Sequence, residues 1–487
     1  MAGEILHNLQ KTLDTTLESF LDLVGCDGGS VYTVRKNSDG EEILKFEAMI
    51  TRSINLRGVP EHLRSLEFQI NDSSAVGRTA AHRKPLLLNM ISGEVSPRVG
   101  DMLNYPTRNI FSGPLITPRG DLVGVVQPLN KLPQDETPFD PYATSALPNF
   151  DKKDERLFSV IAGQAALAIE NSLLLEEQER LIEGFVDACV TAIEARDPVT
   201  SGHSVRVSNY TVGLAEAVNR TDRGPLRETH FTPAQLRELR FAAMLHDIGK
   251  IGIKEEILQK EKKLFPWELE LISMRLKLMR TQMMLRQQTD GGNYEPDISR
   301  IDSVWERLVL ANEPWVPGPI VFEVVKELRS LRVPFDTGEI VTALTDEEAD
   351  RISIAKGSLS ASERLEIEGH VSKTFDILKM IPWSRGLEHV ADIASRHHEK
   401  LDGSGYPNGL TAGQIPPQAR MMTICDIFDA LTSDRPYKLA LPVSRALDII
   451  AANVKAGKLD GAYFDVFLQA HLHELLIPRP GAALQRA

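Results

Sequence analysis

Cysteine is scarce in this chain of 487 residues, and Cys26, Cys189 and Cys425 lie far apart. They can form neither a disulfide framework nor a Cys-x-x-Cys metal site, which suits a reducing compartment. No apolar run approaches the roughly 18–20 residues that span a bilayer. The N-terminal segment contains acids and lacks the basic start and apolar middle of a signal peptide. We therefore expect a cytoplasmic chain that does not enter the membrane.

The chain also lacks an excess of positive charge. Its 55 Lys and Arg stand against 68 Asp and Glu, a formal net charge of -13. Nucleic-acid polymers are bound with an excess of Lys and Arg, so we expect no polymeric DNA or RNA partner. A small anionic ligand is compatible with this charge, because a few local cations and metals suffice to hold it.

The hydrophobic pattern changes about a third of the way along the chain, and the length is too great for one core. Residues 5–24 have helical spacing and are followed by strand-like segments, which predicts a mixed α/β first half. Those strand-like segments are 30–34, 42–49, 84–90, 113–118 and 122–130. From Asp151 the pattern predicts helices only. Beyond residue 195 these are 202–218, 232–249, 363–380, 386–399, 415–432 and 443–456.

The apolar spacing in residues 151–195 predicts one or two long helices between the two parts of the chain. Within them, LLEEQERLIEG at 174–184 surrounds a narrow apolar stripe with charged residues. Two interpretations stay open. The segment is either a linker helix that pairs with a second copy of itself, giving a homodimer, or a helix packed on its own domain.

Several of the 12 histidines lie beside other metal-ligand residue types. His246 is adjacent to Asp247, His397 is adjacent to His398, and Asp426 precedes Asp429 by three residues on one helix face. His203 lies near a predicted helix start, and His370 lies in ERLEIEGHVSKTFDIL, within the helix predicted at 363–380. Imidazole and carboxylate are ligands for Fe, Mn or Zn, and two such ions roughly 3.5–4 Å apart hydrolyse phosphoesters. A lone histidine on a helix is more often structural, and this interpretation is given to His7, His62, His82, His230, His389, His471 and His473.

Three motifs in order resemble the HD-GYP family of phosphodiesterases, a subset of the HD metal-dependent phosphohydrolases. They are HDIGK at 246–250, HHEKLDGSGYP at 397–407 and DIFDALTSDRPYK at 426–438. The segment DPVTSGHSVRV and the pair Gly369–His370 also match. The resemblance covers roughly 180–258 and 353–470. It implies an all-α domain that hydrolyses cyclic di-GMP to pGpG, in some members onward to GMP.

Residue by residue, the resemblance implies two divalent metal ions, with Fe or Mn favoured. It assigns one metal to His203, His246, Asp247 and Asp426, with Asp247 bridging to a second metal on His370, His397 and His398. Lys250 would act in catalysis with Asp247 by reaching the phosphate or the attacking water. Tyr406, Arg435 and Lys438 would contact the substrate. Asp429 is expected to orient a neighbouring ligand.

The sequence departs from the family in two places. Residues 259–352 form an extra segment, expected to be a helical insertion, that carries Trp267, Trp305 and Trp315. It could cap the active site, bind a partner or thicken the core. Val199 stands where three-metal members have a glutamate, which favours two metals.

The first half resembles a GAF sensor domain, an antiparallel sheet flanked by helices. The resemblance rests on SSAVGRTAAHRKPLLLNM at 73–90, GPLITPRGDLVGVVQPLNK at 113–131 and FDKKDERLFSVIAGQAALAIENSLL at 150–174. Asn130 and Lys131, with Phe150, Asp154 and Glu155, fit a signature of cyclic-nucleotide-binding GAF domains. The same signature also acts structurally, so a small-molecule GAF ligand stays open.

The expected organisation is a multidomain chain with six parts. They are a GAF core at 1–150, a linker helix region at 151–195, the first part of the HD-GYP domain at 196–258, the insertion at 259–352, the second part at 353–475 and a tail at 476–487. The favoured function is a GAF-regulated cyclic di-GMP phosphodiesterase in signal transduction. The alternatives are a phosphodiesterase for cyclic GMP-AMP, a non-catalytic cyclic-dinucleotide receptor, and a nucleotide-specific HD phosphohydrolase.

Overall fold

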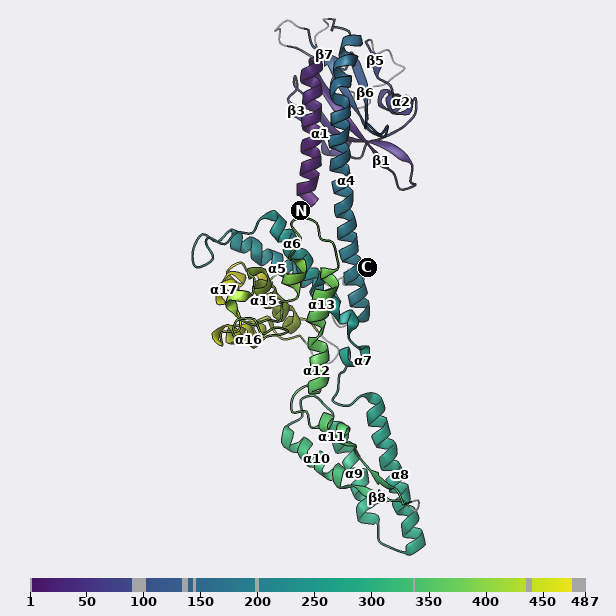
Figure 1. Ribbon diagram of the computed structural model, residues 1–487, viewed down its shortest axis with the longest axis vertical. Coiled ribbons are helices and arrows are strands. Elements are labelled where there is room, and N and C mark those ends of the chain that lie inside the picture. The colour runs from purple at the N-terminus through teal and green to yellow at the C-terminus, as the bar shows by residue number, and fades with distance from the viewer. Residues whose placement is uncertain are drawn as a thin grey trace. The chain divides into compact units, whose positions relative to one another are not determined.

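The chain folds as two compact units, residues 1–184 and 185–487. The computed structural model describes residues 2–89, 102–133, 139–142, 146–197, 201–335, 338–434 and 440–474, with side chains from residue 9 on. One helix of 45 residues, α4 (Lys152–Arg196), belongs to both units (Figure 1). The segment predicted as one or two helices is therefore a single helix.

The first unit is an antiparallel sheet with helices, as expected. The strands run in the order β3-β2-β1-β7-β6-β5, with β4 paired to β2. The strands are β1 (Cys26–Lys36), β2 (Glu42–Thr51), β3 (Leu56–Arg57), β4 (Glu67–Gln69), β5 (Leu86–Leu88), β6 (Ile110–Ile116) and β7 (Leu122–Lys131). Its other elements are α1 (Ala2–Val24), η1 (Glu61–Leu63) and α2 (Ala75–His82).

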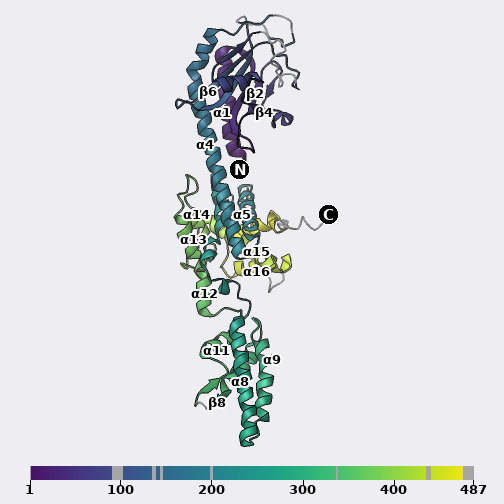
Figure 2. The ribbon, with the colours of Figure 1, turned by 90° about the vertical axis from the view of Figure 1, so that its right-hand side faces the viewer.

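Helices α1 and α4 cover one face of this sheet and lie side by side (Figures 1 and 2). Leu17 and Phe20 of α1 pack with Phe158 of α4 in one buried cluster. The Phe158 ring lies against the backbone of Gly113 in β6, where an added Cβ would meet the ring at 2.3 Å. The glycine thus permits the close contact between α4 and the sheet.

The Asn130–Lys131 signature joins parts of the first unit to one another. The buried Asn130 side chain accepts a hydrogen bond from the Arg108 amide at 2.8 Å and donates one to the Pro106 carbonyl at 2.8 Å. Lys131 Nζ lies 2.6 Å from Asp154 Oδ2 at the start of α4. These polar groups are satisfied within the unit, so the signature here has a structural role and gives no support for a cyclic-nucleotide ligand.

We expect Asn130→Ala to destabilise the first unit by about 2–3 kcal/mol, since two partly buried backbone groups, the Arg108 amide and the Pro106 carbonyl, lose their partners. Asn71→Ala, which removes one exposed side-chain bond to Ser73, is the control, with an expected cost below about 0.5 kcal/mol. All four tryptophans lie in the second unit. Circular dichroism should therefore report an earlier transition for the Asn130 variant while tryptophan fluorescence does not move. Equal stability of the two variants would contradict the structural role.

The second unit is mostly helical. Its elements up to the insertion are α5 (His203–Asn219), α6 (Pro233–Leu245), η3 (Ile248–Gly252) and α7 (Glu255–Leu258). After the insertion come α12 (Ala361–Glu368), α13 (His370–Lys379), α14 (Val390–Ala394), η4 (Ala412–Gln414), α15 (Pro417–Thr432), α16 (Val443–Lys455), α17 (Gly461–Gln469) and η5 (Leu472–Glu474). The helix predicted at 363–380 is two helices that meet at Gly369, and the one predicted at 386–399 is helical only over α14.

The predicted insertion has a core of its own. It contains α8 (Pro266–Asp290), α9 (Glu295–Ala311), α10 (Gly318–Ser330) and α11 (Asp346–Ile352), together with the antiparallel pair β8 (Arg332–Pro334) and β9 (Ile340–Thr342). The sequence did not predict this pair, because strands of three residues are too short to show alternation. Trp305 packs against the insertion's core, whereas Trp267 and Trp315 are 53% and 67% exposed.

By length and composition alone, α4 could cross a membrane, although the sequence analysis found no such segment. One face of the helix, including Phe158, Ala162 and Ile169, belongs to the core under the sheet. This packing is typical of a helix in a globular unit, so the composition of α4 is weak evidence for a membrane span.

Candidate metal centre

The seven predicted metal ligands come together from five separate segments of the second unit. His203 begins α5, His246 and Asp247 follow α6, His370 begins α13, His397 and His398 follow α14, and Asp426 lies within α15. Six are at least nine-tenths buried, and His398 is half-buried. Their ligand atoms form three overlapping groups, each within 4.8 Å: His370–His397–His398, His203–His246–Asp247 and His246–His397–Asp426.

Backbone carbonyls orient three of the imidazoles. The Nδ1 atoms of His246, His370 and His397 lie 2.7, 2.6 and 2.6 Å from the carbonyl oxygen three residues earlier. A carbonyl only accepts, so each Nδ1 carries the hydrogen and each Nε2 presents a lone pair. The Nε2 atoms of His370 and His397 are buried and make no hydrogen bond, although that of His370 lies 3.3 Å from Asp247 Oδ1. Buried, oriented and unpaired Nε2 atoms fit a metal ion.

The Asp247 carboxylate faces ligands of both predicted metals. Its Oδ1 lies 3.3 Å from His370 Nε2, and its Oδ2 lies 3.4 Å from His246 Nε2 and 3.8 Å from His203 Nε2. The same Oδ2 is 2.9 Å from Lys250 Nζ. Two oxygens directed at two groups of imidazoles make a carboxylate that can bridge.

Three of the predicted ligands, Asp247, His397 and His398, have charge states that suit metal binding. Burial alone would raise the pKa of Asp247, but Lys250 and His246 hold it well below its ordinary value. Burial lowers the pKa of His398 to about 4 and that of His397 well below its ordinary value. At neutral pH the carboxylate is therefore charged and these two imidazoles are neutral, as metal ligands must be.

His203 differs from these histidines because two carboxylates flank it. Its Nε2 lies 3.2 Å from Asp426 Oδ1, and its Nδ1 lies 2.8 Å from Asp429 Oδ2. Burial opposes its charge, yet the bonds to Asp426 and Asp429 raise its pKa to about 9. Asp429 also pairs with Arg206 at 2.6 Å, so it orients His203, in agreement with its predicted role. The sequence analysis missed Arg206, although it lies one helical turn after His203.

Lys250 lies between two carboxylates at the edge of the centre. Its Nζ is 2.9 Å from Asp247 Oδ2 and 3.2 Å from Asp197 Oδ2. The sequence did not predict the contact with Asp197. Gly249 places this segment directly on α13, because a Cβ there would meet the His370 carbonyl at 1.9 Å. The glycine of HDIGK is thus required by the close approach of two backbones.

The loop of the Gly-Tyr-Pro motif lies beside the histidines. The Tyr406 ring is 4.7 Å from the His398 ring between centroids. Glu399, which is buried, accepts hydrogen bonds from the amides of Asn408 and Leu410 at 2.8 Å each and so fixes the loop. Arg435, Lys438 and Val199 lie outside the described residues.

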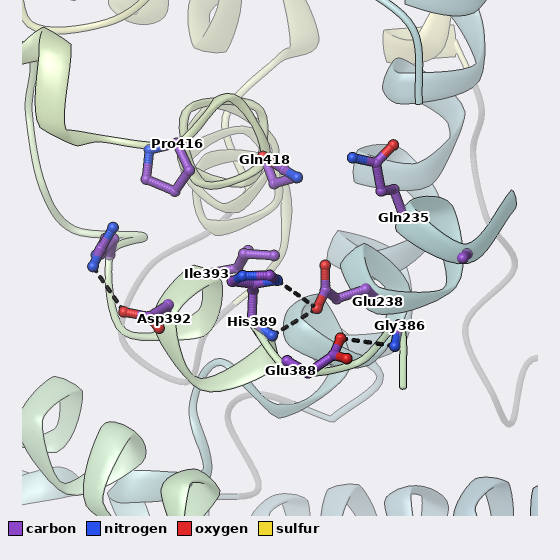
Figure 3. Close-up of a pocket in the computed structure, with 11 residues that line it drawn as sticks. Gln235, Glu238, Gly386, Glu388, His389, Asp392, Ile393, Pro416 and Gln418 are labelled. Carbon is purple, nitrogen blue, oxygen red and sulfur yellow. Dashed lines mark hydrogen bonds and ion pairs between the residues drawn. The ribbon is translucent and has the colours of Figure 1, made fainter. Parts of the chain in front are cut away.

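A pocket of about 520 Å3 lies between α6 and the segment that begins α14. Figure 3 shows Glu238 and His389 directed at each other in it. Glu238, which is 4% exposed, accepts a hydrogen bond from the His389 amide at 2.6 Å, and its Oε1 is 3.3 Å from His389 Nδ1. Glu238 and His389 each precede an active-centre histidine, His246 or His397, by eight residues. The contact therefore holds together the two segments that carry those ligands, a structural role as predicted for His389.

Comparison with known families finds a GAF domain at residues 8–169 and HD domains at residues 200–280 and 347–463. The chain carries a GAF domain followed by an HD domain. The two HD matches leave residues 281–346 between them, which lie within the predicted insertion.

Three bacterial relatives, all from Vibrio cholerae serotype O1, are similar to parts of this chain. The chain is 25% identical over 301 residues to 3'3'-cGAMP-specific phosphodiesterase 3, covering 62% of this chain and 40% of the relative. It is 38% identical over 113 residues to 3'3'-cGAMP-specific phosphodiesterase 1, covering 23% and 26%. It is 27% identical over 292 residues to a probable cyclic di-GMP phosphodiesterase, covering 60% and 45%. The chain thus spans less than half the length of each of these relatives.

We expect Asp429→Asn to weaken metal binding about 10–100-fold, because the amide removes the charge that orients His203. Asp302→Asn is the matched control, since Asp302 also pairs with an arginine but lies in α9, which carries none of the predicted ligands. Titration of metal-depleted protein against a competing chelator measures both affinities. Equal affinities in the two variants would show that Asp429 does not support the centre.

Proposed function

We propose that the chain is a metal-dependent phosphodiesterase that hydrolyses cyclic di-GMP to pGpG, and onward to GMP, under the control of its GAF domain. The observation that supports this most strongly is the buried cluster of seven imidazoles and carboxylates, with its unpaired Nε2 atoms. The presence of an HD domain makes metal dependence expected. The names of the relatives supply the substrate class.

Two divalent ions, Fe or Mn, are proposed as cofactors. His203, His246, Asp247 and Asp426 would hold one, and His370, His397 and His398 the other, with Asp247 bridging. When bound, the ions would activate the attacking water and offset charge on the phosphoryl group. The count of two rests on Val199, because valine has no lone pair for a third ion.

The side chains around the metals have separate proposed roles. Lys250, charged and beside Asp247, is proposed to stabilise negative charge that develops on the phosphoryl oxygens. Its pKa is raised, since Asp247 and Asp197 outweigh its burial, so it carries a positive charge throughout the neutral range. Tyr406 is proposed to contact the substrate beside His398. Arg435 and Lys438 are proposed to bind guanine and phosphate, since a guanidinium can bind bidentately and stack on a base.

An assay of hydrolysis with both cyclic dinucleotides tests two alternatives. Two of the three relatives are named for 3'3'-cGAMP, so cyclic GMP-AMP is the second candidate substrate. A non-catalytic receptor is disfavoured, because a receptor needs neither a full set of ligands nor a charged lysine beside the bridging carboxylate.

We expect Asp247→Asn to abolish hydrolysis of both cyclic dinucleotides while the fold is retained, because an amide cannot supply the bridging negative charge. Metal content and turnover of the purified variant are measured beside Asp448→Asn, a control at an exposed position of α16. More than a few per cent of wild-type activity in Asp247→Asn would exclude Asp247 as the bridge. A wild type that binds metals but cleaves neither dinucleotide would exclude the proposed function.

A homodimer through α4 is also proposed. Two positions in every seven residues of α4 can form the contact seam of a coiled coil. The first of these two positions is apolar and exposed in each heptad: Val160 by 73%, Leu167 by 39%, Leu174 by 55% and Leu181 by 69%. The positions between them, Gln164, Asn171, Gln178 and Phe185, are exposed as well. Leucine at one seam position and an asparagine at the other are typical of a parallel two-stranded coiled coil. The exposed seam favours the linker interpretation, with a second copy of α4 as the partner.

We expect the double variant Leu174→Asp, Leu181→Asp to shift a dimer to monomer, because charges in a coiled-coil seam must be desolvated. Sedimentation equilibrium measures the mass, and Ser159→Asp, an exposed position one residue outside the seam, is the control. A monomeric wild type, or an unchanged dimer in the double variant, would contradict pairing through α4.

The remaining parts of the proposal concern location and regulation. We propose a cytoplasmic protein whose GAF domain takes a small molecule, with no polymeric nucleic-acid partner and no membrane contact. The three cysteines are free thiols, two of them buried, which is consistent with a reducing compartment. We also propose the division into GAF core, linker helix and an HD domain interrupted by residues 259–352.

A further inference from the structure

A pocket of about 370 Å3 lies where the inserted segment leaves and rejoins the HD domain. Two of its lining residues, Asp197 and Lys250, are the pair beside the metal centre. Others, among them Lys262, Glu313 and Trp315, come from the insertion. The pocket is thus shared between the candidate active site and the insertion.

Hydrogen bonds fix the insertion's side of this pocket to the HD domain. The Gly357 amide donates to the Pro314 carbonyl at 3.0 Å, and Ser358 Oγ donates to the Lys260 carbonyl at 3.0 Å. Lys260 Nζ contacts both carboxylate oxygens of Glu363 at 2.8 Å. These contacts join the entry and exit of the insertion, so its lining side chains stand on a fixed backbone.

The lining side chains suit a flat, partly apolar ligand that is attached to a phosphate. The Trp315 side chain is 67% exposed although it borders a pocket, which leaves its ring available for stacking. Most of the remaining wall is apolar, formed by Ile257, Leu258, Pro314, Leu359 and Ile367. The pocket volume lies in the range of about 300–1,000 Å3 typical of small-molecule sites. An aromatic ring with an apolar wall binds a nucleobase by its face, whatever the base.

We propose that this pocket binds one purine base of the cyclic dinucleotide, stacked on Trp315, while a phosphate of the same molecule lies at Lys250. The inference rests on the proposed function and adds a role for the insertion, which supplies a wall of the substrate site. The continuity of the pocket with Lys250 favours the substrate itself as occupant over a separate effector. Trp315 is then a substrate-binding residue, and Trp267, outside this pocket, is not.

The test compares Trp315→Ala, Trp315→Phe and Trp267→Ala in the full-length metal-loaded protein. Each is assayed on cyclic di-GMP, on 3'3'-cGAMP and on methyl 4-nitrophenyl phosphate, a small diester without a base. We expect Trp315→Ala to lower kcat/KM for the dinucleotide about tenfold relative to the small diester, mainly through KM. Trp315→Phe should restore most of the loss, since phenylalanine can still stack. Trp267→Ala should resemble the wild type on all three.

The outcomes separate this inference from the proposed function. The decisive quantity is the ratio of kcat/KM for the cyclic dinucleotide to kcat/KM for the small diester. If the wild type cleaves a cyclic dinucleotide and this ratio is the same in Trp315→Ala and Trp267→Ala, the base does not bind at Trp315 and the inference is wrong. A parallel loss on the small diester would also overturn it, because the effect would then arise at the metal centre. A wild type that cleaves the small diester but no cyclic dinucleotide would remove the proposed substrate, and this inference with it.

Discussion

The candidate active site depends on three backbone carbonyls, those of Ala243, Ile367 and Ala394. Each accepts the Nδ1 hydrogen of the histidine three residues later and so fixes the lone pair of its Nε2. The Nε2 atoms of His370 and His397 are buried and make no hydrogen bond, which is unfavourable, since these groups lose their hydrogen bonds to water. A bound cation would relieve this unfavourable burial. Folding and metal binding are expected to be coupled for this reason.

Further hydrogen bonds hold the elements that carry the predicted ligands against one another. Thr374 accepts a hydrogen bond from the Gly249 amide at 2.9 Å and donates one to the His246 carbonyl at 3.0 Å, so α13 is held against the His-Asp segment. Thr423 donates to the His397 carbonyl at 2.8 Å, which connects α15 to the two adjacent histidines. The elements that carry the ligands thus contact one another through the backbone of the ligand residues. Small shifts of one element would move several ligands together.

The predicted insertion fits into this unit because contacts hold its first and last residues close to each other. The buried pair Lys260–Glu363 and the hydrogen bond between Ser358 and Lys260 join residues about a hundred positions apart in the chain. The inserted helices bury their own apolar core and contribute nothing to the ligand set. Residues 260–262 and 313–315 of this segment line a pocket beside Lys250, where the segment is proposed to contact the substrate.

Much of the candidate site could be predicted from the sequence, because its ligands lie in short motifs whose order and spacing are specific. The seven residues predicted as ligands, Asp247 as the predicted bridge and Asp429 as the predicted orienting residue were all visible in this way. Arg206, Asp197 and Glu399 were missed, because each acts through a partner distant in the chain or through a loop amide that no spacing reveals. Likewise, the Asn130–Lys131 signature could be seen in the sequence, but only its contacts showed that its polar groups are satisfied internally.

The sequence by itself determined the two-part architecture, since the period of its apolar residues changes from strands to helices near Asp151. It also determined the chemistry of the centre, since imidazoles and carboxylates are recognised by residue type. Tertiary structure alone decided which Nε2 atoms are buried and unpaired, which face of α4 stays exposed, and that Trp315 shares a pocket with Lys250. These are properties of side chains brought together from distant segments, and no local pattern along a chain records which segments will meet.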